Sequence, residues 1–323
     1  MSDTDTLNVR VARIKIEAQD IYSFELVDPA GGQLPAFEAG AHVDVRVPDT
    51  TVTRQYSLCS PASERGHYRI AVLNDPNSRG GSRGMHERVY ESDVLEISAP
   101  RNHFPLHPEA GKHLLLAGGI GITPLLCMAH TLHGQGRDFT LHYCARTRES
   151  AAFVAELEQA PFAGRVQFHF SRADGGESKR LDLQALLAAA DAGTHLYVCG
   201  PQVFMDAALE AARKLGWDED RLHYEFFASD VDATGQPFEI KLERSGKTVQ
   251  VAGDQSAADA LLAVGIKLPM SCSQGVCGTC LTRVLQGTPD HRDVYLSKAE
   301  KAKNDQFTPC CSRARSPTLV LDL

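Results

Sequence analysis

The sequence predicts a multidomain fold in three consecutive parts: an antiparallel β-barrel, an α/β doubly wound parallel sheet and a small α+β domain. Three observations lead to this expectation. About the first hundred residues form short segments with period-two alternation, and the next part alternates strand and helix. A polar break then precedes a unit that holds a four-cysteine motif. At 323 residues the chain is long enough for two or three domains with separate cores.

The barrel is expected over residues 1–106. Short strands separated by glycine and proline turns are typical of a small antiparallel barrel or sandwich. The candidate strands are 9–16, 21–26, 42–47, 55–59, 68–73 and 94–97.

Two segments of this first part carry groups that bind phosphate. Arg54-Gln55-Tyr56-Ser57 lies in a strand, and Arg79-Gly80-Gly81-Ser82 lies in a loop whose glycines let backbone amides approach an anion. Tyr56 offers a flat ring with a polar tip that can lie against an isoalloxazine. Taken singly, Arg54 is equally consistent with a surface charge, and Gly80-Gly81 with a plain turn.

The α/β domain is expected over residues 107–228. Strand and helix alternate there, which predicts a doubly wound parallel sheet. The candidate strands are 113–117, 139–144, 166–170, 195–199 and 222–226, and the candidate helices are 124–133, 151–158, 183–190 and 203–215.

Two motifs of this domain indicate a nucleotide site. Gly118-Gly119-Ile120-Gly121-Ile122-Thr123-Pro124 follows an apolar strand and opens a helix, so free amides and the helix dipole can bind a pyrophosphate. Pro124 replaces the third glycine of the usual fingerprint, which leaves a tight packing turn as the alternative. Cys199-Gly200-Pro201 lies at the carboxyl end of a strand, where ligands of open α/β sheets bind. A small buried strand residue is the alternative for Cys199.

A polar linker is expected at 229–237, followed by a separate domain over 238–323. This domain contains Cys272, Cys277 and Cys280 in a C-x4-C-x2-C run, with Cys310 further on. That is the plant-type [2Fe-2S] spacing. A structural zinc site is the alternative, but zinc ribbons favour two C-x2-C pairs or Cys/His knuckles, and here only one C-x2-C exists. Spacing leaves open whether Cys310 or the adjacent Cys311 is the fourth ligand.

Composition excludes several classes of protein. The net charge of −8 makes nucleic acid a poor partner. No apolar run is long enough to span a bilayer, and the first residues lack an export signal. Nine cysteines without such a signal argue against a disulfide framework. We expect a cytoplasmic monomer without membrane contact.

Taken together, these segments resemble the phthalate dioxygenase reductase family, within the ferredoxin-NADP reductase-like superfamily. The resemblance covers essentially the whole chain, in the order flavin barrel, pyridine-nucleotide domain and C-terminal plant-type ferredoxin domain of β-grasp type. The residues that carry it are Arg54 to Cys59, Arg79 to Ser82, Gly118 to Pro124, Cys199 to Pro201, the four cysteines, Asp290-His291-Arg292-Asp293 and the ending 312–323.

The resemblance implies three cofactors and their contacts. FMN would bind Arg54, Gln55, Tyr56, Ser57, Arg79, Gly81 and Ser82, with Ala71-Val72-Leu73 along the flavin ring. The nucleotide would contact Gly118, Gly119, Gly121, Thr123, Ser171, Arg172, Cys199, Gly200 and Pro201. Thr123 and Cys199 would lie by the nicotinamide and Phe227 near the flavin, which makes these three the candidate catalytic residues. The family pattern also assigns the fourth cluster ligand to Cys310, because Cys311 falls on the variable position before Ser-Arg.

The choice of nucleotide depends on the segment after the third strand of the α/β domain. Family members that use NADH tend to carry an acidic or His-Asp segment there, whereas here Ser171-Arg172 precedes Asp174. A Ser-Arg pair can hold a 2′-phosphate, as in the NADP-binding branch of the superfamily. NADH is expected from the family as a whole, with NADPH as the alternative.

The three parts have a chemical reason to share one chain. A nicotinamide delivers two electrons as a hydride, while a [2Fe-2S] cluster accepts one at a time, so a flavin must stand between them. The resemblance therefore implies the reductase of a two-component oxygenase, with a Rieske-type oxygenase as partner or, alternatively, a cytochrome P450. A non-enzymatic carrier or redox sensor is a competing function, but a carrier needs neither flavin nor nucleotide segments.

Overall fold

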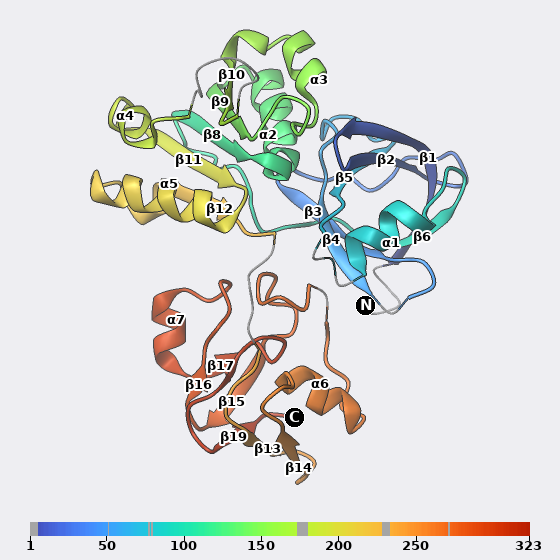
Figure 1. The fold of residues 1–323 in the computed structure, drawn as a ribbon, viewed down its shortest axis with the longest axis vertical. Coiled ribbons are helices and arrows are strands. Elements are labelled where there is room, and N and C mark those ends of the chain that lie inside the picture. The colour runs from blue at the N-terminus through green and yellow to red at the C-terminus, as the bar shows by residue number, and fades with distance from the viewer. Residues whose placement is uncertain are drawn as a thin grey trace. The chain divides into compact units, whose positions relative to one another are not determined.

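The structure is a computed structural model that describes residues 6–50, 52–76, 78, 80–172, 180–227, 233–270 and 272–323. The chain forms two compact units, one over residues 2–227 and the other over 228–323. Figure 1 labels the elements of each unit. Within these described ranges, no helix has the length and apolar character needed to cross a membrane.

The first sheet is antiparallel, with the strand order β4-β3-β6-β1-β2-β5 and β7 paired to β3. The backbone N–H of Cys59, just after β4, donates to Arg69 O on β5 at 2.8 Å, which joins the two ends of this path. The predicted antiparallel β-barrel is confirmed. Its strands are β1 (Thr6–Ala18), β2 (Ile21–Val27), β3 (Ala41–Arg46), β4 (Thr53–Ser57), β5 (Tyr68–Leu73), β6 (Val94–Ser98) and β7 (Arg101–Asn102).

Helix α1 (Gly81–Arg88) begins inside the segment that the sequence predicted to be a loop. Among its described residues, only Gly81, Gly84 and Met85 are buried. A Cβ on Gly84 would lie 2.5 Å from Val47 Cγ1, so this glycine allows close packing on the barrel. A helix that buries mainly glycine has no apolar stripe, and hydrophobic periodicity therefore does not detect it.

The second sheet consists of five parallel strands in the order β10-β9-β8-β11-β12, as the strand-helix alternation predicted. On β8, Leu115 and Ala117 pack into a core with α2, while Leu114 and Leu116 pack into a core with α5. The strands are β8 (Lys112–Gly118), β9 (Asp138–Ala145), β10 (Val166–Phe170), β11 (Thr194–Cys199) and β12 (Leu222–Glu225), and the helices are α2 (Ile122–Gly134), α3 (Val154–Gln159), α4 (Leu183–Ala188) and α5 (Gln202–Lys214).

The strand order of this sheet reverses between β8 and β11. Open α/β sheets bind ligands at such a switch point, outside the carboxyl ends of the strands. Gly118 and Cys199 are the last residues of β8 and β11, so the two predicted nucleotide motifs meet there.

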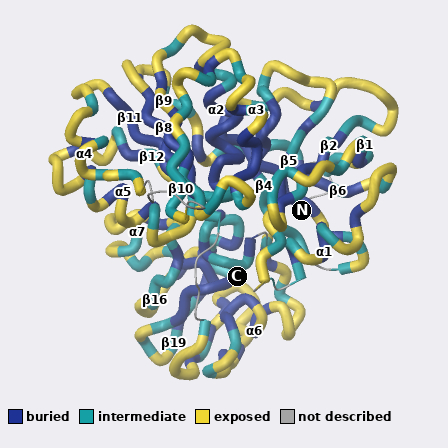
Figure 2. Tube along the Cα trace, turned by 45° about the horizontal axis from the view of Figure 1, so that its top comes forward, coloured by how far each residue is buried: buried dark blue, intermediate teal, exposed yellow. Residues whose placement is uncertain are grey.

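A continuous apolar core joins the two sheets of the first unit. It contains Ala71 of β5 and Phe104 on the barrel side, together with Leu125 of α2 and Tyr197 of β11. Figure 2 shows the buried segments concentrated around β8, β11 and α2. This shared core explains why residues 2–227 form one compact unit, while the boundary between 106 and 107 stays a prediction.

The second unit is a small α+β domain with a mixed sheet in the order β14-β13-β19-β15-β17. Strands β13 and β19 are parallel and the other pairs antiparallel, and α6 packs on the core of this sheet. The elements are β13 (Phe238–Leu242), β14 (Thr248–Val251), α6 (Ala257–Ala263), β15 (Thr282–Gln286), β16 (Pro289–Asp290), α7 (Lys298–Lys303), β17 (Gln306–Phe307), β18 (Arg313–Ala314) and β19 (Thr318–Leu321).

Two arginines fix the described end of the expected linker to this second unit. The buried Arg313 guanidinium donates to four carbonyl oxygens at 2.5 to 3.0 Å, and Arg292 Nη1 donates to Thr234 O at 2.6 Å. The four carbonyls belong to Ala233, Gln236, Ala252 and Gln255. Residues 229–232 of the expected linker lie outside the described residues.

Candidate functional site

The four predicted ligand cysteines all lie in the second unit, on two segments of the chain. Cys272, Cys277 and Cys280 lie on the loop between α6 and β15, and Cys310 follows β17. All four are buried, with at most 8% of each residue exposed. Burial of four thiols without a disulfide is the arrangement that a metal cluster requires.

The thiols of these cysteines are arranged in pairs. Cys272 is in hydrogen-bonding contact with Cys277, and Cys310 with Cys280 and with Cys311. Among the described residues, no group of three potential ligands is placed to hold a single metal ion. A two-iron cluster instead divides four thiolates between its irons, so the pairs Cys272–Cys277 and Cys280–Cys310 fit that cluster better than one zinc ion.

Glycines and backbone amides shape the cluster loop. Gly275 and Gly278 have φ of 72° and 69°, a region that favours glycine. A Cβ on Gly278 would lie 2.2 Å from the ring of Tyr295, so that position also lacks space. The N–H groups of Gln274 and Thr279 donate to Cys272 Sγ at 3.3 Å and Cys277 Sγ at 3.5 Å. Such hydrogen bonds adjust the reduction potential of a cluster.

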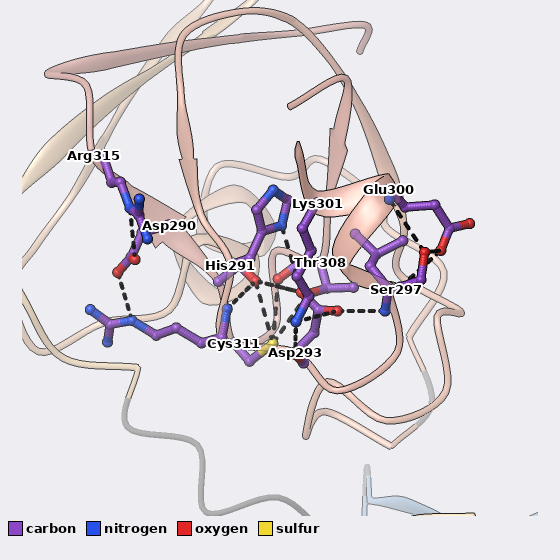
Figure 3. A network of polar contacts seen from close by, with 12 residues as sticks. Asp290, His291, Asp293, Ser297, Glu300, Lys301, Thr308, Cys311 and Arg315 are labelled. Atoms are coloured by element: carbon purple, nitrogen blue, oxygen red, sulfur yellow. Dashed lines mark hydrogen bonds and ion pairs between the residues drawn. The ribbon is translucent and has the colours of Figure 1, made fainter. Parts of the chain in front are cut away.

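A polar network around Asp293 is connected to this loop, and Figure 3 shows its side chains. Asp293 lies at its centre: its carboxylate accepts from Leu296 N at 2.7 Å, and its backbone oxygen accepts from Lys301 Nζ. Val294 N donates to Gly275 O at 3.0 Å, which ties the network to the cluster loop. The Asp290-to-Asp293 motif therefore supports the loop and supplies no cluster ligand among the described contacts.

Cys311 has a different environment from Cys310. Its Sγ lies 3.1 Å from Thr308 Oγ1 and would meet a Cβ on Gly275 at 2.5 Å. The residue is fully buried. It therefore packs beneath the loop, whereas the thiol of Cys310 reaches the loop cysteine Cys280.

In the first unit, Arg54 lies against the N-terminus of α1. A Cβ on Gly81 would lie 2.7 Å from Arg54 Cγ and Nε, so the missing side chain makes room for the guanidinium. Ser82 Oγ accepts from Asp75 N at 3.1 Å. A cation beside a helix N-terminus is suited to a phosphate. Arg79 lies outside the described residues.

The rest of the R-Q-Y-S strand carries buried polar groups. No hydrogen bond satisfies Tyr56 Oη among the described residues, although this atom is buried. An orphaned buried hydroxyl costs about 1–3 kcal/mol, so a bound ligand that supplies a partner would be favoured. Gln55 Nε2 lies 3.2 Å from His42 Nε2, and Ser57 Oγ donates to Glu225 Oε2 at 3.2 Å.

The two glycine motifs of the second sheet pack backbone against backbone. A Cβ on Gly121 would lie 2.3 Å from Cys199 O, and one on Gly200 would lie 2.8 Å from Gly118 Cα. Thr123 is buried near the start of α2 and donates to Ile120 O at 3.1 Å. The structure therefore brings the backbones of Gly121 and Cys199 into direct proximity, and their contact with a nucleotide stays a prediction.

Other predicted residues are less closely tied to this crevice. Phe227 is partly buried against the core shared by the two sheets. The backbone N–H groups of Ser171 and Arg172 donate to Ala145 O and Arg146 O, beyond the ends of β10 and β9. Asp174 lies outside the described residues.

Sequence reasoning gave no role to Glu225, although the structure places it between Cys199 of the parallel sheet and Ser57 of the barrel. This residue ends β12, pairs in register with Cys199 of β11, and receives the hydrogen bond from Ser57 of the barrel. Burial raises the pKa of its carboxyl to about 8, and the hydrogen bond from Ser57 only partly offsets this. This raised pKa favours the neutral form of the carboxyl. A glutamate at the carboxyl end of a predicted strand was the indication that the sequence offered.

Three features together define an iron–sulfur oxidoreductase. The second unit has a loop of paired thiols, the barrel has an arginine at a helix N-terminus, and the parallel sheet has glycine-rich turns at its carboxyl edge. Two family models agree with this class. Residues 240–315 match the 2Fe-2S iron-sulfur cluster binding domain, and residues 98–222 match the N-terminal domain of dimethylamine monooxygenase subunit DmmA-like proteins. The C-terminal unit is accordingly a [2Fe-2S] domain.

Individual relatives extend this likeness over the whole chain. The chain is 51% identical to vanillate O-demethylase oxidoreductase of Pseudomonas sp. (strain HR199 / DSM 7063), covering 98% of this chain and 100% of that protein. It is 40% identical to phthalate dioxygenase reductase of Burkholderia cepacia, covering 98% and 97%. The chain therefore belongs to the phthalate dioxygenase reductase family, which comprises reductase components of oxygenase systems.

Solved structures show the same architecture. A structure of phthalate dioxygenase reductase, described as modular for electron transfer from pyridine nucleotides to [2Fe-2S], matches with a TM-score of 0.80 and 39% identity over 98% of both chains. An intact type IV self-sufficient cytochrome P450 monooxygenase matches with a TM-score of 0.82 and 38% identity, covering 98% of this chain and 41% of that one.

Proposed function

We propose that this protein takes two electrons from NADH onto FMN in the first unit and passes them singly through its [2Fe-2S] cluster to a Rieske-type terminal oxygenase. The observation that carries this proposal is the crevice where Ser57 of the barrel, Cys199 of the parallel sheet and Glu225 meet. A hydride donor and a flavin must lie in contact, and this crevice joins the two predicted binding domains.

The flavin site is assigned to the barrel, over residues 1–106. Arg54 and the N-terminus of α1 bind the phosphate, and Tyr56 Oη and Ser57 receive the rest of the cofactor. Gln55, Arg79, Gly81, Ser82 and the strand Ala71-Val72-Leu73 complete the proposed site. FMN supplies the exchange between two-electron and one-electron chemistry when bound. The chain contributes position, charge and exclusion of water.

The nucleotide site is assigned to residues 107–228. The turn 118–121 and the segment 199–201 form the proposed binding surface for the nucleotide, because their backbones pack directly against each other. Thr123 and Cys199 lie at the nicotinamide end, with Phe227 near the flavin. Ser171 and Arg172 lie at the far end of the sheet, where a 2′-phosphate of NADPH would meet them. NADH remains the proposed donor, because the family assignment rests on the whole chain.

The cluster is assigned to the ligands Cys272, Cys277, Cys280 and Cys310. The support is the pairing of their thiols, together with the contact of the Cys311 thiol with Thr308 and its packing under Gly275. A cluster at the end of the chain provides a one-electron outlet, which an oxygenase partner requires.

The Rieske-type partner is supported by relatives named for a phthalate dioxygenase and a vanillate O-demethylase. A cytochrome P450 is the second candidate, because a self-sufficient P450 contains a region similar to the whole of this chain. We propose a monomeric reductase, since all proposed cofactor residues lie on one chain. Reconstitution with either type of oxygenase distinguishes the two partners by product formation.

Anaerobic mixing with NADH and cytochrome c tests the activity directly. Cytochrome c should be reduced only by protein that holds its flavin, and NADPH should support a slower rate. Absence of flavin-dependent reduction would refute the enzyme and favour a plain electron carrier. A large preference for NADPH would overturn the choice of nucleotide alone.

A further inference from the structure

An ion pair between the barrel and the α/β domain has no role in the proposed chemistry. The Arg69 guanidinium, on β5, donates to both carboxylate oxygens of Glu156, on α3, at 2.7 and 2.8 Å. Only 14% of the arginine side chain and 27% of the glutamate side chain are exposed. Two parallel charge-assisted hydrogen bonds fix direction as well as distance, which a single surface ion pair does not.

Each partner is also bound to its own part of the first unit. On the barrel side, Arg69 Nη2 donates to Cys59 O at 3.3 Å, and Arg69 O accepts from Cys59 N at 2.8 Å. On the α/β side, Glu156 Oε1 lies 3.6 Å from His130 Nε2 of α2. The pair therefore connects the point where the barrel closes with two helices of the α/β domain.

The charge of this pair is stable at neutral pH. Burial alone would raise the pKa of the Glu156 carboxyl, but its contacts with His130 and Arg69 lower the pKa to about 2. The carboxyl is therefore ionised throughout the neutral range, and the arginine always carries its charge. Removal of one partner would leave the other charge partly buried without compensation.

The arginine also lies over a residue with an unusual backbone. Phe153 precedes α3 with φ of 62°, a left-handed conformation that a bulky residue adopts only under constraint. Its ring is buried, and Arg69 Cζ lies 5.0 Å from the ring centroid. A cation is attracted to an aromatic face, so Arg69 contacts both the residue that begins α3 and the carboxylate within it.

The place of this pair in the fold relates it to hydride transfer. Arg69 lies on the same strand as Ala71-Val72-Leu73, which is proposed to run along the flavin ring. Glu156 belongs to the domain that is proposed to bind the nucleotide. Hydride transfer requires the two rings in contact, and a shift of about 1 Å caused by a distant change can lower the rate about a hundredfold.

We propose that the Arg69–Glu156 pair is a positioning device that fixes the flavin strand of the barrel relative to the nucleotide domain. It acts on the alignment of the two reacting rings without touching either cofactor. Loss of the pair would leave both binding surfaces intact and change only how they face each other. This inference rests on the proposed function, because that function supplies the two rings.

The test uses Glu156→Gln, which keeps the shape of the side chain and removes its charge. Glu158→Gln is the matched control, because Glu158 lies on the same helix and forms an exposed ion pair with Arg148 at 2.6 Å. Anaerobic rapid mixing with NADH gives the limiting rate of flavin bleaching and the dissociation constant of NADH separately. We expect the limiting rate to fall about tenfold in Glu156→Gln while the dissociation constant stays within about twofold, and neither to change in the control.

Amide hydrogen exchange of the resting protein gives a readout without turnover. Segments 59–70 and 149–159 should exchange faster in Glu156→Gln, because they lose the contact that joins them, and at the wild-type rate in the control. Arg69→Lys is a second variant that keeps the charge but loses the forked guanidinium. It should show a smaller fall in the limiting rate, and it keeps the proposal testable if Glu156→Gln fails to fold.

Several results would overturn the positioning role. One is a wild-type limiting rate in both Glu156→Gln and Arg69→Lys, and another is an equal loss of rate in the control. A weaker binding of NADH that accounts for the slower bleaching would do the same. If NADH fails to bleach the flavin of the wild type, the proposed function fails. Hydrogen exchange then still tests the pair, and exchange at the wild-type rate in Glu156→Gln would show that it does not hold the two parts together.

Discussion

The two units of this chain build their sites from different materials. In the second unit, four thiols provide every proposed bond to the cofactor, and three of them lie on one loop. In the first unit, the proposed nucleotide site is built largely of backbone: added Cβ atoms on Gly121 and Gly200 would meet the main chain of Cys199 and Gly118. A site held by four covalent ligands should fail completely when one is lost, whereas a site held by many weaker contacts should fail by degrees.

The largest effect is expected at the cluster. Cys310→Ser should abolish the visible absorbance of the cluster, because a hydroxyl replaces one of only four thiolates. Cys311→Ser should retain the cluster, since its sulfur packs against Thr308 and Gly275. Absorption and electron paramagnetic resonance spectra check both variants. Loss of the cluster in Cys311→Ser with retention in Cys310→Ser would reverse the ligand assignment.

A backbone clash should give a large but partial effect in the crevice. Gly121→Ala would place a Cβ 2.3 Å from Cys199 O, so the turn or the strand end must move. We expect the KM for NADH to rise about tenfold and stability to fall by about 1–3 kcal/mol. Gly134→Ala is the control, because no atom lies within 4 Å of its added Cβ and the helix gains propensity. Equal behaviour of the two variants would contradict the backbone-built site.

A single phosphate contact should matter less than the turn. Arg54→Lys keeps the charge beside Gly81 but loses the forked guanidinium. We expect the dissociation constant for FMN to rise about tenfold, measured by the fluorescence of released flavin. The cluster spectrum should remain that of the wild type, since Arg54 belongs to the other unit. Unchanged FMN affinity would remove Arg54 from the phosphate site.

The most gradual effect should appear in the response of the first unit to pH. Burial lowers the pKa of His42, His142 and His223 from 6.5 to about 4. The folded state holds these rings neutral while the unfolded state protonates them, so stability is complete above about pH 6.5 and declines toward pH 4. Glu225, with its raised pKa, acts in the opposite direction. The net loss should be on the order of 1–2 kcal/mol per histidine at about pH 5.

Trp217 provides the measurement for this last prediction. It is the one tryptophan of the sequence, it packs in the core of the parallel sheet, and the Arg221 guanidinium lies over its ring at 4.8 Å. Its fluorescence therefore reports urea unfolding of the first unit. A midpoint that stays constant between about pH 7 and pH 5 would show that these histidines are not held neutral.

The same contrast explains what the sequence could predict. Cluster spacing is local, so Cys272, Cys277 and Cys280 were identified from residue order, and the strand 166–170 from its apolar pattern. The position of Glu225 beside Cys199 and Ser57 could not be predicted in this way. It depends on the parallel register of β11 with β12 and on a hydrogen bond from the barrel. Helix α1 was missed because glycines form much of its buried face. Arg313 looks like a surface charge in sequence, yet four carbonyls bind it in the core.

Anaerobic rapid mixing of NADH with the wild-type protein and with Cys310→Ser tests the central claim most directly. The wild type should show bleaching of the flavin absorbance followed by reduction of the cluster, and Cys310→Ser should show the flavin change alone at a similar rate. Two results would contradict an electron path from the flavin to the cluster. One is reduction of the cluster by NADH in protein that has lost its flavin, and the other is failure of NADH to bleach the flavin in either protein.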